Sequence, residues 1–253
     1  MSKAGIFFDA HVHVYPEFDI DVLLSTFTAN AERLAPGADA LAMAVMLRSF
    51  QPGLRAALGA CGAPGVWRLE EAPGGSLTAT DGTRRIYLLP ARQVAARERI
   101  EALGLFGDAM IPDGLPLEET FSRLRAAGFR PVLAWGLGKW LFKRARVVKT
   151  ALDGAAQSGG DLLVGDSALR PTFWSKPRPF TDAEARGMRV IYGSDPLPRK
   201  GDDHSAGRYA TLIEAPFDPL SPAASILAAL GDRSAAVSAV GRRYGLADTL
   251  KRV

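Results

Sequence analysis

The sequence predicts an α/β protein: a TIM-like parallel (β/α) barrel with seven or eight strands and a small β-hairpin insertion. Two observations predict this fold class. Short apolar runs alternate with helical patterns along the chain, as they do where helices connect parallel strands. The length of 253 residues, with 47% hydrophobic and 23% charged residues, suits one large globular domain. We therefore expect a single barrel domain over residues 1–253, with the hairpin insertion at about residues 64–84.

The expected strands are the short apolar runs, which lie at residues 5–14, 38–47, 84–94, 100–106, 130–138, 161–169 and 189–197, with 208–216 as a candidate eighth. Between the second and third runs, the stretches VWRLEE and SLTAT are separated by a Pro-Gly-Gly turn. This pattern predicts a β-hairpin. The hairpin is too short to hold a core of its own, so we expect an insertion in the barrel.

Capping and breaking residues mark the expected helices. Asp19 is the expected N-cap of a helix over 21–35, which ends before Pro36. Pro116 and Gly128 bracket a helix over 117–127, with proline before its first turn and glycine after its last. Three further helical segments are expected from Thr181 and Glu184 at capping-box spacing with Gly187 at the end, from Ser221 and Pro222, and from the region after Asp232.

Composition restricts the class of function. Cys61 is the single cysteine, so no intrachain disulfide forms, and we expect a reducing cytoplasm. No apolar run approaches the roughly 18 residues of a membrane span, and no signal peptide is expected at the amino terminus. The 31 basic residues against 27 acidic ones give a net charge of +4. This charge is too weak to argue for nucleic acid, which we expect to be an unlikely partner.

The first apolar run carries the strongest functional signal. In the stretch FFDAHVHV, Asp9, His11 and His13 occupy alternate positions and should share one strand face. Both faces of a barrel strand are buried, so polar side chains at its carboxyl end need a partner. Two imidazoles and a carboxylate suit a divalent metal ion. The alternative is a pair of buried histidines satisfied by hydrogen bonds.

A late run carries a matching signal. In VIYGSDPLP, an apolar strand ends in Asp195 before two prolines. The carboxyl ends of barrel strands meet at one mouth, so Asp195 should face the histidine pair and take a catalytic, metal-binding role. The alternative is a turn aspartate, since Ser-Asp-Pro is a common turn sequence.

A first strand that ends in His-x-His, together with Gly-Ser-Asp-Pro at the last strand, resembles the metal-dependent hydrolase barrels: the amidohydrolase superfamily and the related PHP phosphoesterases. The resemblance implies that His11, His13 and Asp195 bind a divalent metal (zinc, manganese or iron) that activates a water molecule. About seven strands suit the distorted seven-stranded PHP barrel slightly better than the full eight-stranded barrel. These motifs cover only the two ends of the chain.

The chain departs from those families because it holds three histidines in all. A cluster of two or three metals built mainly from histidine is therefore excluded. A single metal with Asp166 or His204 as a further ligand stays open. Asp166 ends the run at 161–169 as Asp195 ends its own, so it is also a candidate general base, with a chain-turning aspartate as the alternative.

Lys139 follows the fifth run and is flanked by Trp135 and Trp140. It has three interpretations: a carboxylated lysine that bridges two metals, an anion-binding or substrate-orienting lysine, or a solvated helix start. His204 lies in the loop KGDDHSAGRY, which could act as a lid over the barrel mouth, and a surface histidine is the alternative.

Basic residues recur at the expected strand ends and would form a positive funnel for an anionic substrate. The candidate substrate-binding residues are Arg92, Arg170, Arg208 and His204, with Arg48, Arg199 and Lys200 nearby in the pattern. Simple scatter of 31 basic residues is the alternative.

Together these features predict a metal-dependent hydrolase that acts on a small anionic substrate, either a phosphoester or a carboxylate-bearing amide or ester. Asp166, Lys139 and Asp195 are the expected catalytic residues. Metal-assisted decarboxylation or hydration stays open. The alternative class is a non-catalytic anion-binding barrel with a regulatory or assembly role. A nuclease is a third class, for which only residues 135–146 interleave aromatic and basic side chains.

Overall fold

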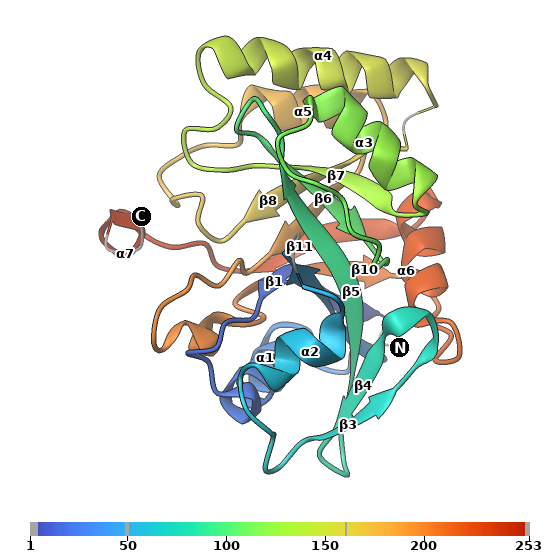
Figure 1. Ribbon diagram of the computed structural model, residues 1–253, viewed down its shortest axis with the longest axis vertical. Coiled ribbons are helices and arrows are strands. Elements are labelled where there is room, and N and C mark those ends of the chain that lie inside the picture. Colours follow the sequence, from blue (N-terminus) through green and yellow to red (C-terminus); the bar gives the residue numbers. More distant parts are fainter. Residues whose placement is uncertain (1–4, 49–50, 160, 251–253) are drawn as a thin grey trace.

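Residues 5–48, 51–159 and 161–250 are described by the structure, a computed structural model (Figure 1). A nearly closed, barrel-shaped sheet runs in the order β11-β10-β1-β2-β5-β6-β7-β8-β9. Its strands are β1 (Ile6–His13), β2 (Ala40–Leu47), β5 (Arg85–Ala95), β6 (Glu101–Leu105), β7 (Arg130–Ala134), β8 (Leu163–Ser167), β9 (Val190–Gly193), β10 (Tyr209–Glu214) and β11 (Ala236–Gly241). The predicted TIM-like barrel is confirmed, and each expected run, including the eighth, holds one of these strands.

Strand direction differs in part from the all-parallel expectation. β6 runs antiparallel to both β5 and β7, and β10 runs antiparallel to β1. Only residues 96–100 connect β5 to β6. A parallel crossover needs about a dozen residues or more, so such a short link returns the chain antiparallel.

The hairpin consists of β3 (Arg68–Glu71) and β4 (Leu77–Thr80), joined by a short 3-10 turn η1 (Pro73–Gly75). β4 pairs antiparallel with the first half of β5, so the hairpin extends the sheet along that long strand (Figure 1). The hairpin therefore lies at the end of the barrel where the parallel strands begin.

The helices are α1 (Ile20–Leu34), α2 (Leu54–Gly59), α3 (Leu117–Ala126), α4 (Lys143–Gln157), α5 (Arg178–Ala185), α6 (Pro222–Gly231) and α7 (Leu246–Leu250), with a 3-10 turn η2 (Asp202–Ser205). α3, α4 and α5 gather on one side of the sheet (Figure 1). Asp19 caps α1 as predicted, and its Oδ1 accepts from the backbone N–H groups of Asp21 and Val22. No helix in the described ranges is long and apolar enough to cross a membrane.

Two helix predictions are wrong in detail. Thr181 does not cap α5, which begins at Arg178, and the Thr181 hydroxyl donates to the Arg178 carbonyl within the helix. The region after Asp232 first forms strand β11, which pairs with β10, and only α7 is helical. The edge of the sheet at β10 accepts this segment, so tertiary pairing overrides the helical pattern.

The nearly closed sheet comes together where β9 lies against β1 and β10. A β-carbon on Gly193 would lie 2.6 Å from the His11 backbone nitrogen, so only glycine allows this approach. Just beyond β9, the Asp195 N–H donates to the His11 carbonyl at 2.8 Å. On the other side of β9, the Tyr192 N–H donates to the Thr211 hydroxyl of β10 at 2.8 Å. These contacts form the seam of the barrel.

Replacing Gly193 with alanine should destabilise the protein, because the added methyl group meets backbone atoms of β1 that cannot rotate away. We expect a loss of about 1–3 kcal/mol in the free energy of unfolding, measured by urea denaturation. Gly231→Ala is the control, since a β-carbon there has no neighbour within 4 Å. Equal stability of Gly193→Ala and wild type would contradict the close seam.

Candidate metal centre

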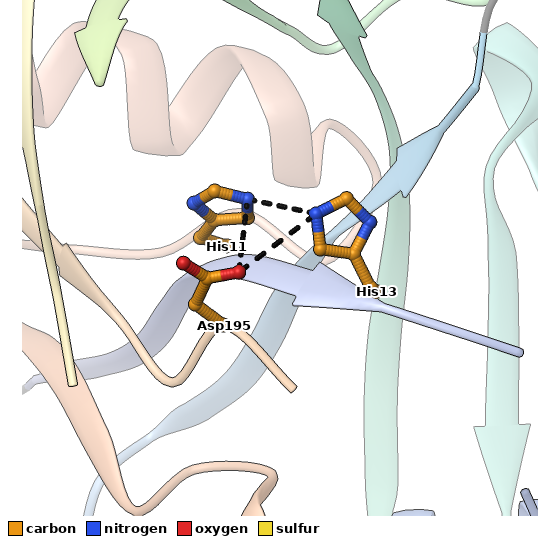
Figure 2. A group of neighbouring side chains, drawn as sticks. All are labelled: His11, His13 and Asp195. Carbon is orange, nitrogen blue, oxygen red and sulfur yellow. Dashed lines mark hydrogen bonds and ion pairs between the residues drawn. The ribbon is translucent and has the colours of Figure 1, made fainter. Parts of the chain in front are cut away.

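Three predicted ligands converge at the carboxyl end of β1. Figure 2 shows His11 and His13 from β1 facing Asp195, which lies two residues after β9. The two Nε2 atoms are 3.1 Å apart, and the Asp195 Oδ1 lies 3.6 Å from that of His11 and 3.8 Å from that of His13. Among the described residues, these three form the group whose ligand atoms could hold one metal ion.

Gln93, which was not among the predicted ligands, lies next to this group. The Gln93 Oε1 of β5 lies 3.0 Å from both histidine Nε2 atoms. Gln93 stands near the carboxyl end of a parallel strand, next to Arg92 in the sequence. Gln93 is uncharged and carries no imidazole, although its amide oxygen can also be a metal ligand. Strand position was the signal that could have identified it.

The donor set fits a divalent metal. Four-coordinate zinc with bonds of roughly 2.1 Å holds its ligand atoms about 3.4 Å apart. The separations of 3.1, 3.6 and 3.8 Å among the two imidazoles and the carboxylate lie around that value. Imidazole nitrogens with carboxylate and amide oxygens suit zinc, manganese or iron. Two Nε2 atoms and one amide oxygen within 3.1 Å of each other gain a shared partner when a cation binds.

Burial of these side chains also favours the binding of a cation. Desolvation, together with the neighbouring His11, holds the pKa of His13 well below its usual value, so the imidazole is neutral and able to bind a metal. Desolvation also raises the pKa of Asp195, and the His11 imidazole and the Ser167 hydroxyl oppose that rise. A bound cation would favour the ionised carboxylate that burial disfavours.

The backbone holds Asp195 in an uncommon conformation. Its φ angle is +52°, in the left-handed region that L-residues other than glycine rarely adopt. The hydrogen bond from its N–H to the His11 carbonyl fixes the main chain there. The Ser167 hydroxyl, at the end of β8, donates to Oδ2 at 2.9 Å and leaves Oδ1 toward the histidines. Three strand ends thus orient one carboxylate.

Asp9 does not share the face of the two histidines, contrary to the period-two pattern. The pairing of β1 with β2 shifts register between Asp9 and Val12. Phe7 before the shift and Val12 after it pack into the same apolar cluster, so the side-chain alternation changes phase. A β-bulge re-aims side chains in this way.

The Asp9 carboxylate instead binds the seam. It accepts hydrogen bonds from the N–H and hydroxyl of Ser194 and from the N–H of Gly207. Complete burial raises the pKa of Asp9 to about 6, against the effect of these donors. Asp9 therefore holds the chain before and after Asp195, the predicted metal ligand.

A cavity of about 320 Å³ adjoins the group formed by His11, His13 and Asp195, which we call the metal group. His13, Gln93 and Asp195 line it, together with the Lys139–Glu101 ion pair. Lys139, a predicted catalytic residue, therefore reaches the same cavity as the metal ligands. Glu101, at the start of β6, was not among the predicted site residues.

The other predicted site residues lie elsewhere. Both oxygens of Asp166 accept from Arg170, at 2.8 and 2.6 Å, and Oδ2 also accepts from the Tyr209 hydroxyl. Asp166 and Arg170 are buried and do not line the cavity. The structure thus brings this predicted base and this predicted substrate ligand to each other, and not to the metal group.

Arg92, Arg208 and His204 do not line the cavity either. Arg92 is fully buried, and its guanidinium donates to the carbonyls of Arg48, Gln51 and Asp108. The Arg208 guanidinium stacks 4.2 Å above the Tyr244 ring, and His204 is exposed in η2. Strand-end arginines in this barrel tie loops together, so the predicted funnel does not form from them.

A scan against protein-family models finds no match for this sequence, and a search of curated proteins finds none. Solved structures do match in fold. PsfC from Pseudomonas syringae PB-5123 superposes with a TM-score of 0.53 and 13% identity, over 99% of this chain and 95% of that one. A two-domain protein containing a predicted PHP-like metal-dependent phosphoesterase, from Bacteroides vulgatus ATCC 8482, gives 0.51 and 14%, over 94% of this chain and 65% of that one.

A lesion-specific endonuclease is similar too: PfuEndoQ from Pyrococcus furiosus gives a TM-score of 0.53 and 13% identity, over 92% of this chain and 57% of that one. A complex of Endonuclease Q with a 27-mer duplex substrate that carries an abasic lesion gives 0.54 and 12%, over 98% and 66%. The chain thus spans less than two thirds of PfuEndoQ and of the Bacteroides protein.

At these identities the likeness shows the fold alone: this chain shares its barrel with these structures, one of which contains a predicted PHP-like metal-dependent phosphoesterase. The resemblance inferred from the His-x-His strand and the Gly-Ser-Asp-Pro run is confirmed at the level of the fold. The neighbours and the His11–His13–Asp195 group support the predicted hydrolase class and a divalent metal cofactor.

One expectation is overturned. We expected nucleic acid to be an unlikely partner, because the net charge of +4 is small. Two of the similar structures are of endonucleases, one of them in complex with a 27-mer duplex substrate that carries an abasic lesion, so the comparison points toward nucleic acid and not away from it. Net charge was the wrong measure, since phosphate contacts depend on where the charges lie.

Protein purified without chelator should contain about one equivalent of transition metal, and His13→Ala should lose it, because one of two imidazole ligands is removed. Elemental analysis measures the stoichiometry. His204→Ala is the control, since this third histidine is exposed and outside the group. Unchanged metal content in His13→Ala would show that His13 is not a metal ligand.

Gln93→Ala should weaken zinc binding about tenfold or more, because one oxygen of the donor set is lost. Competition with a fluorescent chelator measures the affinity. Gln93→Glu should bind at least as tightly as wild type, since it keeps the oxygen and adds a charge. Equal affinities for all three proteins would show that Gln93 is not a ligand.

Proposed function

We propose that the chain is a metal-dependent phosphoesterase that hydrolyses a phosphoester through a metal-activated water. The observation that carries this proposal is the convergence of His11, His13 and Asp195 beside a cavity that also contains Lys139. A divalent metal held by His11, His13 and Asp195 would supply Lewis acidity there, since such an ion polarises a phosphoryl oxygen and lowers the pKa of a bound water. The fold likeness favours phosphoesters over carboxylate-bearing amides and esters.

Lys139 supplies the positive charge for the substrate. Its side chain is 36% exposed, and its ammonium group pairs with the Glu101 carboxylate in the cavity lining. A phosphate that enters the cavity replaces or shares that partner. The ammonium then stabilises negative charge that develops on the phosphoryl oxygens.

Glu101 is the proposed proton acceptor. Asp166, the base expected from the sequence, already uses both carboxylate oxygens for Arg170 and Tyr209. Glu101 lines the cavity, and its side chain is 21% exposed, so a water molecule can reach it. When a phosphate takes the Lys139 ammonium, the Glu101 carboxylate is released to accept a proton.

Ser167 and Tyr15 complete the site. The Ser167 hydroxyl holds the Asp195 carboxylate, as described above. The Tyr15 ring packs beside that of His13, with centroids 5.7 Å apart, and the Arg48 guanidinium lies 4.7 Å above the tyrosine ring. This stack limits the movement of the His13 imidazole and places a cation near the cavity.

Lys139→Ala should lower kcat/KM for a phosphomonoester or a phosphodiester by about 10- to 100-fold, because one cation that contacts the phosphoryl group is lost. Turnover of p-nitrophenyl phosphate and bis-p-nitrophenyl phosphate with added manganese or zinc measures this effect. Lys149→Ala is the control, since this exposed lysine of α4 pairs with Asp153.

An abasic duplex DNA and a carboxylate-bearing anilide complete the substrate panel. Metal-loaded protein that turns over none of the phosphoesters would contradict the proposed function. Turnover of the anilide alone would assign the other hydrolase class. Binding of metal and phosphate without turnover of any substrate would instead identify an anion-binding barrel.

A further inference from the structure

A second cavity, of about 220 Å³, adjoins the metal cavity. The two cavities share Trp135 and Gly136 in their linings. Trp135, Trp140 and Trp174 line the second cavity, together with prolines and the exposed Arg178. Trp135 and Trp140 are buried, and Trp174 is half-buried. A largely apolar cavity with a cation, next to the metal cavity, has the composition of a ligand-binding site.

The indole walls are held in fixed positions. The rings of Trp135 and Trp174 meet at 83° with centroids 5.9 Å apart. Trp140 packs edge-on against Phe180, and its Nε1–H donates to the Ala134 carbonyl at 3.0 Å. The two buried indoles form a fixed support for the half-buried Trp174 ring, which can offer stacking area with little loss of side-chain freedom on binding.

Two arginines hold the loop that carries Trp174. The Trp174 carbonyl accepts hydrogen bonds from the guanidinium groups of Arg170, at 2.8 Å, and Arg243, at 3.0 Å. Arg170 is in turn fixed by its buried ion pair with Asp166. The strand-end pair that the sequence assigned to chemistry therefore positions one wall of the second cavity.

Lys139 lies at the junction of the two cavities. A β-carbon on Gly136 would lie 2.6 Å from the Lys139 Cδ, so the lysine stem folds directly over this glycine. Gly136 lines both cavities, and the Lys139 ammonium group reaches Glu101 in the metal cavity. An anion held by that ammonium has the indole cavity beside it.

We propose that the indole cavity binds the nucleobase of a nucleotide whose phosphoester lies at the metal centre. This inference rests on the proposed function and names its substrate class. A base is flat, stacks on indole rings, and is joined through a sugar to a phosphate that suits Lys139. The guanidinium of Arg178 adds a planar cation for stacking or for an edge oxygen of the base. Free nucleotides and nucleotides within a strand present the same chemistry.

Titration calorimetry with chelator present tests base binding without any turnover. A nucleoside 5′-monophosphate should bind the wild-type protein, and Trp174→Ala should weaken binding about tenfold. Trp174→Phe should restore most of the affinity, because it keeps a flat ring. Phe173→Ala is the matched control: this neighbouring aromatic is 64% exposed and does not line the cavity.

Three results would overturn the proposal: no binding of nucleotide to wild type, equal binding by wild type and Trp174→Ala, or equal weakening in Trp174→Ala and Phe173→Ala. A short single-stranded oligonucleotide tested beside the mononucleotide distinguishes the source of the base. Tighter binding of either ligand supports the proposal, provided that Trp174→Ala weakens it.

Kinetics separate this proposal from the proposed function. In active, metal-loaded protein, Trp174→Ala should raise KM for a nucleoside monophosphate about tenfold and leave kcat/KM for methyl phosphate unchanged. Inactivity toward every phosphoester with intact, Trp174-dependent nucleotide binding would contradict the hydrolase and keep the base site. Normal hydrolysis with no effect of Trp174→Ala in either assay would do the reverse.

Discussion

The close approach of β9 to β1 is the constraint on which the rest of the structure depends. Gly193 brings the two strands together, and the hydrogen bond from Asp195 to the His11 carbonyl joins them one step beyond. The same contact that brings the ends of the sheet together also places Asp195 beside His11 and His13. The positive φ angle of Asp195, a strained conformation of order 1–3 kcal/mol, persists because Asp9, Ser167 and His11 all hold its surroundings.

Charged residues at the strand ends serve two purposes in this barrel. Lys139 and Glu101 line the metal cavity and are partly exposed. Asp166, Arg170 and Arg92 are buried and bind each other or backbone carbonyls. A buried ion pair gains little net stability over apolar packing, although loss of one partner is costly. The Asp166–Arg170 pair is better explained by what it orients, the Trp174 loop beside the cavity.

Much of the fold could be predicted from the sequence, because apolar runs and capping residues are local signals. Asp19 and Pro116 mark helix starts that the structure keeps. His11, His13 and Asp195 were identified because strand-end position is readable from the chain. Gln93 could not be predicted as a ligand because the uncharged amide gives no clear signal in the sequence. The prediction that Asp9 shares the face of the histidines is wrong because the register shift depends on pairing with β2. The partners of Asp166 and Arg170 depend on tertiary packing that no local pattern encodes.

The seam also couples the metal site to the order in which the chain assembles. Asp9 and Ser194 are separated by 185 positions in the sequence, and their hydrogen bonds form only when the first and last parts of the barrel have met. Contacts of such long range come late in folding, since loop closure must precede them. The predicted ligands come together only once β1 and the chain after β9 have met, and an ion bound there would favour the folded barrel by mass action. An ion held by His11, His13 and Asp195 would therefore report that β1 and β9 have come together.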